Sequence, residues 1–393
     1  MRYMKPILLV LLLLTLIVPI AAQDGNLTDS CVMDYDESVN YFSDTVEVEY
    51  ADGFSVRYTN NYKIVEITPW VGAEETLTYV LVQCGTPPPT ETDIEADAII
   101  EVPIDSLVIL STTILPHLDS QGVLDRLAGV DTLQFTSNEA VLERADSIAE
   151  VGGEFSGINT ELLLDTQPDL IMAQQFSSAG TALDTIQSTG LQVVLNADFA
   201  DTSPLGQAEW GKFVSLFFNT EAEANAVFEN VVAEYDRLAE LAEDVEARPT
   251  VIAASPFQGS WFMPAGDSYL AQLIEDAGGD FVFSDESGTS IVLDFEVVLE
   301  QGNEADYWVN FNQFWATTDD MLADDSRYEE FAAFQNGNLW NNNKRVNGNG
   351  GNDYFENGVA NPHLLLADLI AIFHPDLLPE HEFDFYQPLE MSE

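Results

Sequence analysis

The chain has 393 residues, of which 46% are hydrophobic, so it can bury two cores of ordinary domain size and is not intrinsically disordered. Its 68 acidic and 12 basic residues give a formal net charge of −56 at pH 7. A surface this acidic repels polyphosphate, and so few lysines and arginines cannot form a stripe that releases counterions, which excludes nucleic acid as a partner.

Residues 1–22 have the pattern of a secretory signal. Arg2 and Lys5 precede the apolar run ILLVLLLLTLIVPI, and Ala21 and Ala22 are small residues suited to cleavage. An uncleaved membrane anchor is the alternative, because the run approaches the length that spans a bilayer. In both cases the rest of the chain is expected outside the cytoplasm, either periplasmic or secreted. Cleavage removes the two basic residues and changes the net charge from −56 to −58.

Residues 23–103 are predicted to form an antiparallel β extension and a stiff linker. Strand-like alternation occurs in VEVEY, FSVRY, YKIVEI and TLTYVLVQ between residues 45 and 83, and the linker GTPPPTETD follows at 85–93. The two cysteines, Cys31 and Cys84, flank this region, and in an exported chain a disulfide between them is expected. A lipid-bearing Cys31 is the alternative, although LTDSC lacks the apolar residue expected three places earlier.

Residues 104–220 and 248–376 are predicted to form two α/β lobes. Short apolar strands alternate there with helical segments, which is typical of parallel sheets covered on both faces. The clearest strands are SLVIL, DLIMA and LQVVLN in the first lobe and TVIAAS and DYWVNF in the second. Between the lobes, residues 221–247 have an amphipathic pattern without Gly or Pro, which predicts a rod-like connecting helix. Residues 377–393 are predicted to be a tail.

The two lobes share a local sequence pattern. In the first lobe, Asn159 is predicted to cap a helix in which Glu161 stands second, and this helix leads to the strand LIMA. In the second lobe, Asp294 and Glu296 occupy the corresponding positions before the strand YWVN. The same supersecondary unit is therefore expected once in each lobe.

These segments, in this order and spacing, resemble the substrate-binding proteins of ABC importers that take up iron-siderophores and cobalamin. The resemblance covers roughly residues 104–376 and is strongest in the N-x-E…PDLI stretch and in YLAQLIEDAGG, and the N-terminal extension lies outside it. It implies two doubly wound lobes joined by one rigid helix, a ligand held in the crevice between them, and delivery of that ligand to a membrane permease and its ATPase.

The loops after the predicted strands are the candidate ligand site, because ligands of open α/β sheets bind beyond the carboxyl ends of the strands. One of them, NLWNNNKRVNGNGGNDYFENG at 338–358, combines Asn, Gly and aromatic residues that suit a large organic ligand. The expected ligand-binding residues are Ser111, Thr112, Thr113, Gln175, Phe176, Trp261, Phe262, Asn312, Trp315, Arg345, Tyr354 and Phe355. Core packing is the alternative for the aromatic ones, as is expected of Trp308 within its strand.

The expected cargo is a metal chelate, either a ferric siderophore or a cobalamin-like corrinoid, and no cofactor is expected in the protein itself. Lys344 and Arg345 are among the few cations near the candidate site, and they could instead neutralise surface acids, so the ligand is expected to be only mildly anionic. A bare metal ion is the alternative cargo, but the chain has four histidines and only His117 lies on a predicted cleft loop.

The resemblance also implies a role for the paired glutamates. In the resembling proteins, one glutamate from each lobe meets arginines of the permease, and Glu161 and Glu296 match those positions. The alternative is that both are ordinary helix-terminal acids that the helix dipole stabilises.

No enzyme is expected. The chain has no G-x-S-x-G elbow, no H-E-x-x-H pair and no phosphate-binding G-x-x-x-x-G-K-[ST], and TTDDMLADDS lacks the glycine of a calcium loop. A hydrolase without a recognisable motif and an extracellular ligand sensor on the same fold are the alternatives. The chain is expected to be a monomer.

Overall fold

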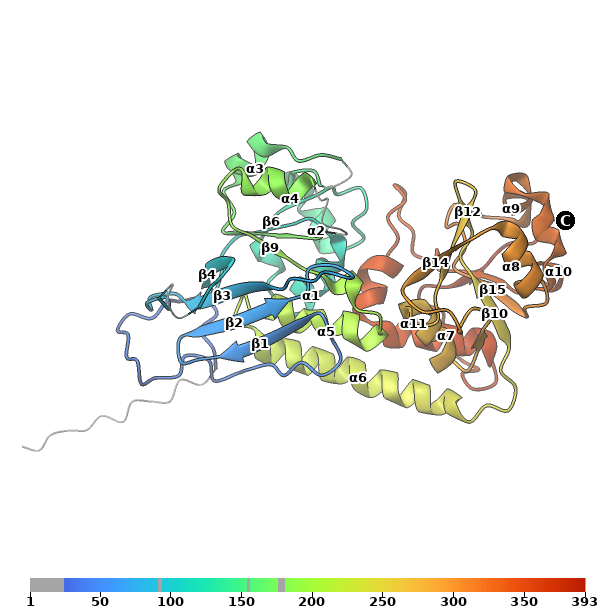
Figure 1. Cartoon of the computed structure of the whole chain (residues 1–393), viewed down its shortest axis with the longest axis horizontal. Coiled ribbons are helices and arrows are strands. Elements are labelled where there is room, and N and C mark those ends of the chain that lie inside the picture. The colour runs from blue at the N-terminus through green and yellow to red at the C-terminus, as the bar shows by residue number, and fades with distance from the viewer. Residues whose placement is uncertain (1–24, 91–93, 154–155, 176–180, 393) are drawn as a thin grey trace, which may run out of the picture.

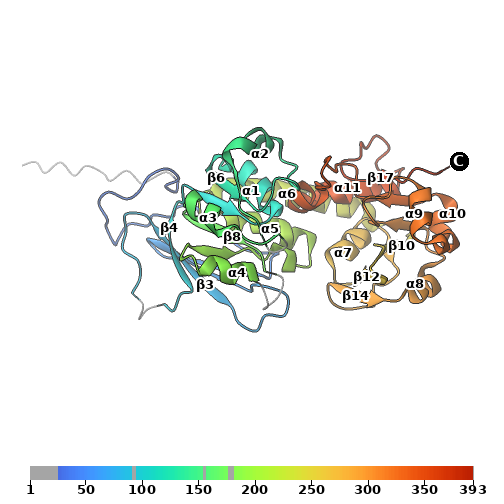
Figure 2. The same ribbon diagram turned by 90° about the horizontal axis from the view of Figure 1, so that it is seen from above.

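The structure is a computed structural model that describes residues 25–90, 94–153, 156–175 and 181–392, so the predicted signal lies outside the described residues. Two α/β lobes lie side by side, and the helix α6 (Glu221–Glu243) runs beneath both of them (Figure 1). The view from above shows the same two lobes separated along the long axis of the molecule (Figure 2). The predicted two-lobe α/β fold is thus confirmed. Within the described ranges, no helix has both the length and the apolar character that crossing a bilayer requires.

The N-terminal extension forms a four-stranded sheet in the order β1-β2-β3-β4, in which β4 is parallel to β3 and the other pairs are antiparallel. Its strands are β1 (Phe54–Tyr58), β2 (Tyr62–Ile67), β3 (Leu77–Gln83) and β4 (Ala98–Val102). The prediction of a strand at VEVEY is wrong. The backbone N–H groups of Glu49, Tyr50 and Ala51 donate to the buried Glu209 carboxylate instead of to a neighbouring strand.

The extension is not a separate appendage, because its sheet shares one hydrophobic core with the first lobe. Val65 and Leu81 belong to the same buried cluster as Leu107 of the first lobe. Lys63 and Glu221 form a fully buried ion pair, with 2.5 Å between Nζ and Oε1, which ties β2 to the first turn of α6. The predicted disulfide between Cys31 and Cys84 is present.

The first-lobe sheet is entirely parallel, with the strand order β7-β6-β5-β8-β9. Its strands are β5 (Leu107–Ile109), β6 (Leu127–Val130), β7 (Ala149–Glu150), β8 (Leu170–Ala173) and β9 (Val193–Leu195). Its helices are α1 (Leu115–Ser120), α2 (Glu139–Glu143), α3 (Thr160–Thr166), α4 (Thr181–Gln187) and α5 (Pro204–Ser215). The strands predicted at SLVIL, DLIMA and LQVVLN correspond to β5, β8 and β9. Strand β8 is buried along its whole length, as expected of a central parallel strand covered on both faces.

The second lobe has a main sheet in the order β13-β10-β15-β16-β17 and a small antiparallel sheet in the order β11-β12-β14. The main strands are β10 (Thr250–Ala253), β13 (Asp280–Phe281), β15 (Tyr307–Val309), β16 (Leu339–Asn341) and β17 (Gln387–Pro388). The small sheet comprises β11 (Pro256–Phe257), β12 (Ser260–Pro264) and β14 (Ser290–Leu293). The helices are α7 (Tyr269–Asp276), α8 (Phe295–Gly302), α9 (Thr318–Asp324), α10 (Ala332–Asn336) and α11 (Pro362–Phe373).

The C-terminal segment belongs to the second lobe, so the prediction of a tail after residue 376 is wrong. Strand β17 pairs with β16, and Phe385 and Tyr386 are fully buried. The buried carboxylate of Asp368 in α11 accepts hydrogen bonds from the backbone N–H groups of Asp384, Phe385 and Tyr386. This contact orders the segment, because a buried carboxylate needs donors and the chain end supplies them.

Candidate ligand-binding site

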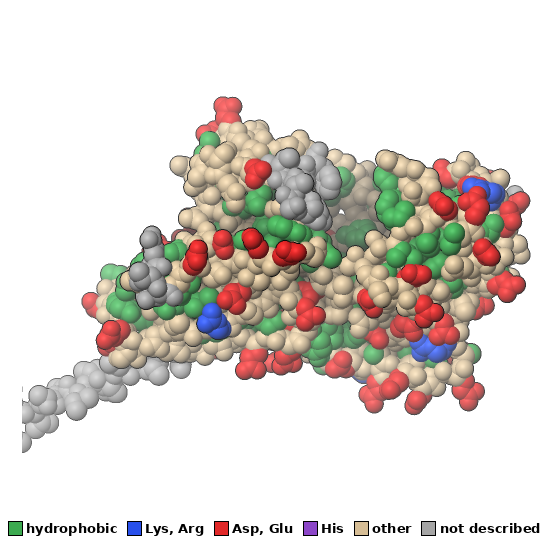
Figure 3. All heavy atoms as spheres, in the orientation of Figure 1, with side chains coloured by type: hydrophobic (Ala, Val, Ile, Leu, Met, Phe, Trp, Pro, Cys, Tyr) green, Lys and Arg blue, Asp and Glu red, His purple; other side chains and the backbone are tan. Residues whose placement is uncertain are grey.

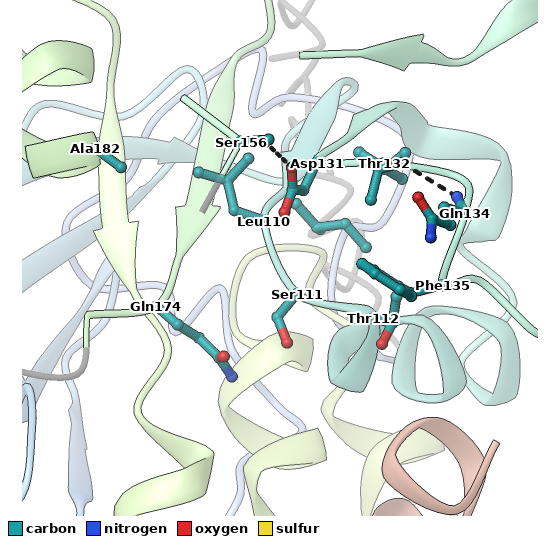
Figure 4. A pocket seen from close by; sticks show the side chains of 12 residues that line it. Leu110, Ser111, Thr112, Asp131, Thr132, Gln134, Phe135, Ser156, Gln174 and Ala182 are labelled. Atoms are coloured by element: carbon teal, nitrogen blue, oxygen red, sulfur yellow. Dashed lines mark hydrogen bonds between the residues drawn. The ribbon is translucent and has the colours of Figure 1, made fainter. Parts of the chain in front are cut away.

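A cavity of about 450 Å³ lies at the carboxyl edge of the first-lobe sheet (Figure 4). Strands β5, β6 and β8 are parallel, so their carboxyl ends meet at one edge and the residues that follow them line the cavity. Its polar and aromatic wall consists of Ser111 and Thr112 after β5, Asp131, Thr132, Gln134 and Phe135 after β6, and Gln174 after β8, with Ser156 from a further loop. Ile109, Leu110, Val130 and Ala182 supply apolar surface.

A buried carboxylate behind the cavity holds part of this wall in place. Asp198 is 2% exposed, and it accepts hydrogen bonds of 2.6 Å from Thr113 Oγ1 and from Gln174 Nε2. Burial raises the pKa of Asp198, whereas the hydrogen bond from Thr113 lowers it. Because this network fixes the Gln174 amide before a ligand arrives, the polar wall is preorganised.

Asp131 places a second carboxylate at the cavity wall, between Ser156, Leu110 and Thr132 (Figure 4). Its Oδ1 accepts a hydrogen bond of 3.0 Å from Ser156 Oγ, and burial raises its pKa. A glycine is required at position 153, because a Cβ there would lie 2.5 Å from Asp131 Oδ2.

The asparagine-rich loop at 338–358 of the second lobe, called the bridging loop below, reaches across to the rim of this cavity. The Asn347 side-chain amide donates to the carbonyl oxygens of Gln134, at 3.2 Å, and Thr136, at 3.0 Å. In return, Gln134 Nε2 donates to the carbonyl oxygen of Asn349 at 3.2 Å. Gly351 allows the close approach, since a Cβ there would lie 2.5 Å from the Phe135 carbonyl oxygen. The asparagines and glycines of the loop therefore join the lobes at this rim.

Two phenylalanines of the second lobe are exposed near the contact between the lobes. Phe314 is 73% exposed and packs beside Gly350 in the bridging loop. Phe355 is 53% exposed and belongs to the helical turn Tyr354–Gly358, which contacts the turn Thr112–Ile114 of the first lobe. The face drawn in Figure 3 is hollowed between the lobes and carries many more acidic than basic side chains. The interlobe region thus combines aromatic surface, amides and a polar wall.

The first-lobe predictions agree with this geometry in part. Ser111 and Thr112 line the cavity, and their contact with a ligand remains a prediction. Thr113 lies behind the wall, where it binds Asp198. Gln175 is buried and does not line the cavity, whereas its neighbour Gln174 does. Phe176 lies outside the described residues.

Three predicted cleft aromatics are core residues instead. Trp261 is fully buried and stacks on Trp308 at a ring-centroid distance of 5.4 Å, because alternation along β12 turns it inward. Trp315 is buried against Phe311, and its Nε1 donates to a carboxylate oxygen at the end of α9. Tyr354 is 3% exposed within the same cluster, and burial raises its pKa to about 12. None of the three can offer a ring face to a ligand in this conformation.

Three further residues predicted in the second lobe do not line the cavity either. Phe262 is 48% exposed on the outer face of the small sheet but does not line the cavity. Asn312 has a structural role, since its Oδ1 accepts the backbone N–H of Phe314. Arg345 forms an ion pair with Asp353, with 2.8 Å between Nη2 and Oδ2, so its charge is already neutralised.

Asp131 and Phe135, which line the cavity, and Phe314, which is exposed beside the bridging loop, were not predicted from the sequence. The first two follow β6, whose sequence LAGV is short and contains a glycine, so this strand was not among the clearest ones. Recognising β6 as a strand would have marked VDTLQF as a loop at the carboxyl edge. Phe314 precedes Trp315, which was predicted to bind ligand, and the sequence does not show which of these two adjacent rings faces solvent.

His117 is not a cleft residue. It is 6% exposed and packs against Gly211, where a Cβ would lie 2.6 Å from its Nδ1, and burial lowers its pKa to about 4. Among the described residues, no group of three or more His, Cys, Asp or Glu side chains is arranged to hold a metal ion.

Glu161 and Glu296 both lie exposed in the first turn of a helix, in α3 and α8 respectively. Asn159 caps α3 as predicted, through a 3.1 Å hydrogen bond from Leu162 N. Asp294 occupies the N-cap position of α8 but makes no side-chain capping hydrogen bond, so that part of the prediction is wrong. Glu296 also forms an exposed ion pair of 3.1 Å with Arg327.

Two α/β lobes on one connecting helix, with a first-lobe cavity whose rim the second lobe contacts, have the architecture of a two-lobed binding protein. Residues 107–343 match the family of periplasmic binding proteins, and since this is more than half of the chain, the protein belongs to that family. The resemblance to the substrate-binding proteins of ABC importers is thereby confirmed.

Individual relatives are distant. An uncharacterised lipoprotein of Methanocaldococcus jannaschii is 24% identical over 301 residues, which cover 73% of this chain and 69% of the relative. An ABC transporter substrate-binding protein from Listeria monocytogenes has a TM-score of 0.52 at 17% identity, covering 69% of this chain and 99% of its own. A molybdate-binding periplasmic protein of Haemophilus influenzae has a TM-score of 0.55 at 15% identity, covering 71% and 89%. At these identities the structures support the fold alone.

Proposed function

We propose that this protein is the substrate-binding component of an ABC importer that captures a metal chelate, a ferric siderophore or a corrinoid, between its lobes. The observation that carries the proposal is the cavity of about 450 Å³ at the first-lobe sheet edge, where the bridging loop of the second lobe meets it. A space of this size, lined by apolar groups and a few fixed polar ones, suits an organic ligand.

The cavity wall does not favour a bare ion as cargo. A transition-metal ion needs several converging histidine, cysteine or carboxylate ligands, and the described cavity wall offers Asp131 as its one such side chain. An oxyanion such as molybdate, which the Haemophilus influenzae protein binds, would meet the carboxylate of Asp131, and among the described lining residues no Lys or Arg offsets that charge.

The location that we propose is outside the cytoplasm. The family, the lipoprotein relative and the signal-like segment at residues 1–22 support it. The proposal for the cargo is tested by titration calorimetry of the purified protein with cobalamin and a panel of ferric siderophores. At least one chelate should bind with one-to-one stoichiometry. If every chelate fails while a sugar or a peptide binds tightly, the proposed cargo is wrong.

We further propose that Glu161 and Glu296 dock the loaded protein onto the permease. Both are exposed, one on each lobe, and charges of this kind speed and orient association while salt screens them. The double variant Glu161→Ala with Glu296→Ala should retain its affinity for ligand in solution and lose most uptake by the reconstituted transporter.

The matched control for this experiment is Asp165→Ala with Glu300→Ala. These two acids are exposed on the same helices, α3 and α8, so the control removes the same charge from nearby positions. Wild-type uptake by the control and reduced uptake by the first variant would support docking. Equal uptake by both variants would show that Glu161 and Glu296 are ordinary helix-terminal acids.

A further inference from the structure

The charge of the cavity is one-sided. Twelve residues line it, and Asp131 is the charged one among them, with no Lys, Arg or His in the described wall. The other polar groups are hydroxyls and the amides of Gln134 and Gln174. A ligand that enters this space therefore meets one carboxylate and otherwise neutral groups.

Asp131 has no counter-ion in the described part of the protein. Ser156 Oγ donates to its Oδ1 at 3.0 Å, and the same Oγ accepts the backbone N–H of Gly153 at 2.8 Å. Burial raises the pKa of Asp131, the hydrogen bond from Ser156 lowers it, and the negative charge of Glu150 raises it further. A half-buried carboxylate without a cation is electrostatically unsatisfied, so a positive group placed beside it gains more than it would in water.

The basic residues of the bridging loop are already engaged within the second lobe. Arg345 is paired with Asp353, and its guanidinium lies 5.0 Å from the ring centroid of Phe385. Lys344 Nζ donates to the backbone carbonyl oxygen of Phe383. Neither cation is therefore held ready for an anionic ligand.

The exposed rings near the cavity suit a cation as well. Phe135 lines the cavity and is 49% exposed, and Phe314 and Phe355 of the second lobe are exposed in segments near the first-lobe rim. Aromatic faces attract cations and are indifferent or unfavourable to anions. The formal net charge of −56 adds a negative potential over the whole molecule, which raises the local concentration of cationic ligands.

We propose that the cleft selects a chelate that carries a positive group, such as an ammonium, and that Asp131 is the residue that recognises this charge. This inference rests on the proposed function and narrows its cargo, which the sequence alone suggested to be mildly anionic. The positive group donates a charge-assisted hydrogen bond to Asp131 Oδ2, while Ser156 Oγ continues to donate to Oδ1.

The test uses three ferric probes that differ in charge. The first is a ferric trihydroxamate with a pendant primary ammonium, the second is its N-acetylated neutral form, and the third is a ferric tris-catecholate with three negative charges. In titration calorimetry of the protein without residues 1–22, the ammonium probe should bind at least about tenfold more tightly than the acetylated probe. The tris-catecholate should show no measurable binding.

The variant Asp131→Asn keeps the size of the side chain and removes its charge. It should weaken binding of the ammonium probe about tenfold and leave binding of the acetylated probe unchanged. Asp165→Asn is the control. Asp165 is exposed on α3, and this substitution removes the same charge from the protein as a whole. Loss of preference in the first variant alone supports recognition by Asp131.

The outcomes separate this inference from the proposed function. Equal binding of the two trihydroxamates, tighter binding of the tris-catecholate, or equal effects of the two aspartate variants would overturn recognition of charge by Asp131, while chelate binding stands. Failure of all three probes, together with cobalamin, would overturn chelate binding and the inference with it.

Discussion

We expect the stability of the contact between the lobes to depend on pH through Glu356. Its side chain is 1% exposed, and its Oε2 accepts the backbone N–H of Ser137, from the other lobe, at 2.8 Å. Its Oε1 is buried, and no hydrogen-bond partner for it is found in the part of the chain that the structure describes. Substitution of Glu356 by Gln keeps the acceptor that Ser137 needs and replaces the charge by a neutral amide, so it isolates the effect of the charge.

The magnitude follows from the pKa of this carboxyl. Burial, together with the nearby Asp353, raises it from the ordinary 4.5 to about 7. At about 1.4 kcal/mol per pKa unit, this difference corresponds to about 3 kcal/mol. Because the folded pKa lies above the unfolded one, the group takes up a proton on folding. Its stabilising contribution is present below about pH 4.5 and is lost as the pH rises to about 7.

We therefore expect Glu356→Gln to be more stable than the wild type by about 3 kcal/mol at pH 8, and by about 1.4 kcal/mol at pH 5.5. Urea unfolding of both proteins at the two pH values measures this difference, and the many other carboxylates cancel because both proteins carry them. Glu304→Gln is the control, since Glu304 is exposed. A stability difference that does not change with pH, or a Gln variant that is less stable at pH 8, would refute the reasoning.

Two further predictions concern the core and the extension. Trp261→Ala should lower the free energy of unfolding by about 3 to 5 kcal/mol, whereas Phe262→Ala on the exposed face should change it by less than about 1 kcal/mol, and equal losses in urea unfolding would contradict this assignment. Replacing Cys31 and Cys84 by Ala should lower the stability by about 2 to 4 kcal/mol, because their bridge closes a loop across 53 positions. Thermal melting without reductant measures this loss, and unchanged melting would show that the extension does not depend on the bridge.

Local patterns in the sequence were sufficient for the architecture. The alternation of short apolar runs with helical segments predicted β5, β8, β9, β10 and β15, and the amphipathic run without Gly or Pro predicted α6. These patterns are informative because burial on both faces or on one stripe requires a fixed spacing of apolar residues. The disulfide followed from the count of two cysteines in a chain with a signal-like segment.

Sequence patterns did not predict how VEVEY and the segment after residue 376 pack. VEVEY alternates like a strand, yet its donors bind Glu209, a residue about 160 positions away. The segment after residue 376 has little periodicity, yet Asp368 orders it from α11. In both cases a buried carboxylate competes with regular secondary structure for backbone N–H groups, and its position depends on the folded chain.

The sequence alone established two α/β lobes, a connecting helix and candidate loops at the strand ends, because these depend on spacing along the chain. Only the tertiary structure decided which side chains of those loops are exposed and which belong to the core. Trp261 and Phe262 are adjacent on β12 and point to opposite faces, and the layer packed against the sheet decides which face is core. Asp131 likewise lines the cavity because the parallel strands bring β6 beside β5, and among the described residues its carboxylate has no counter-ion there.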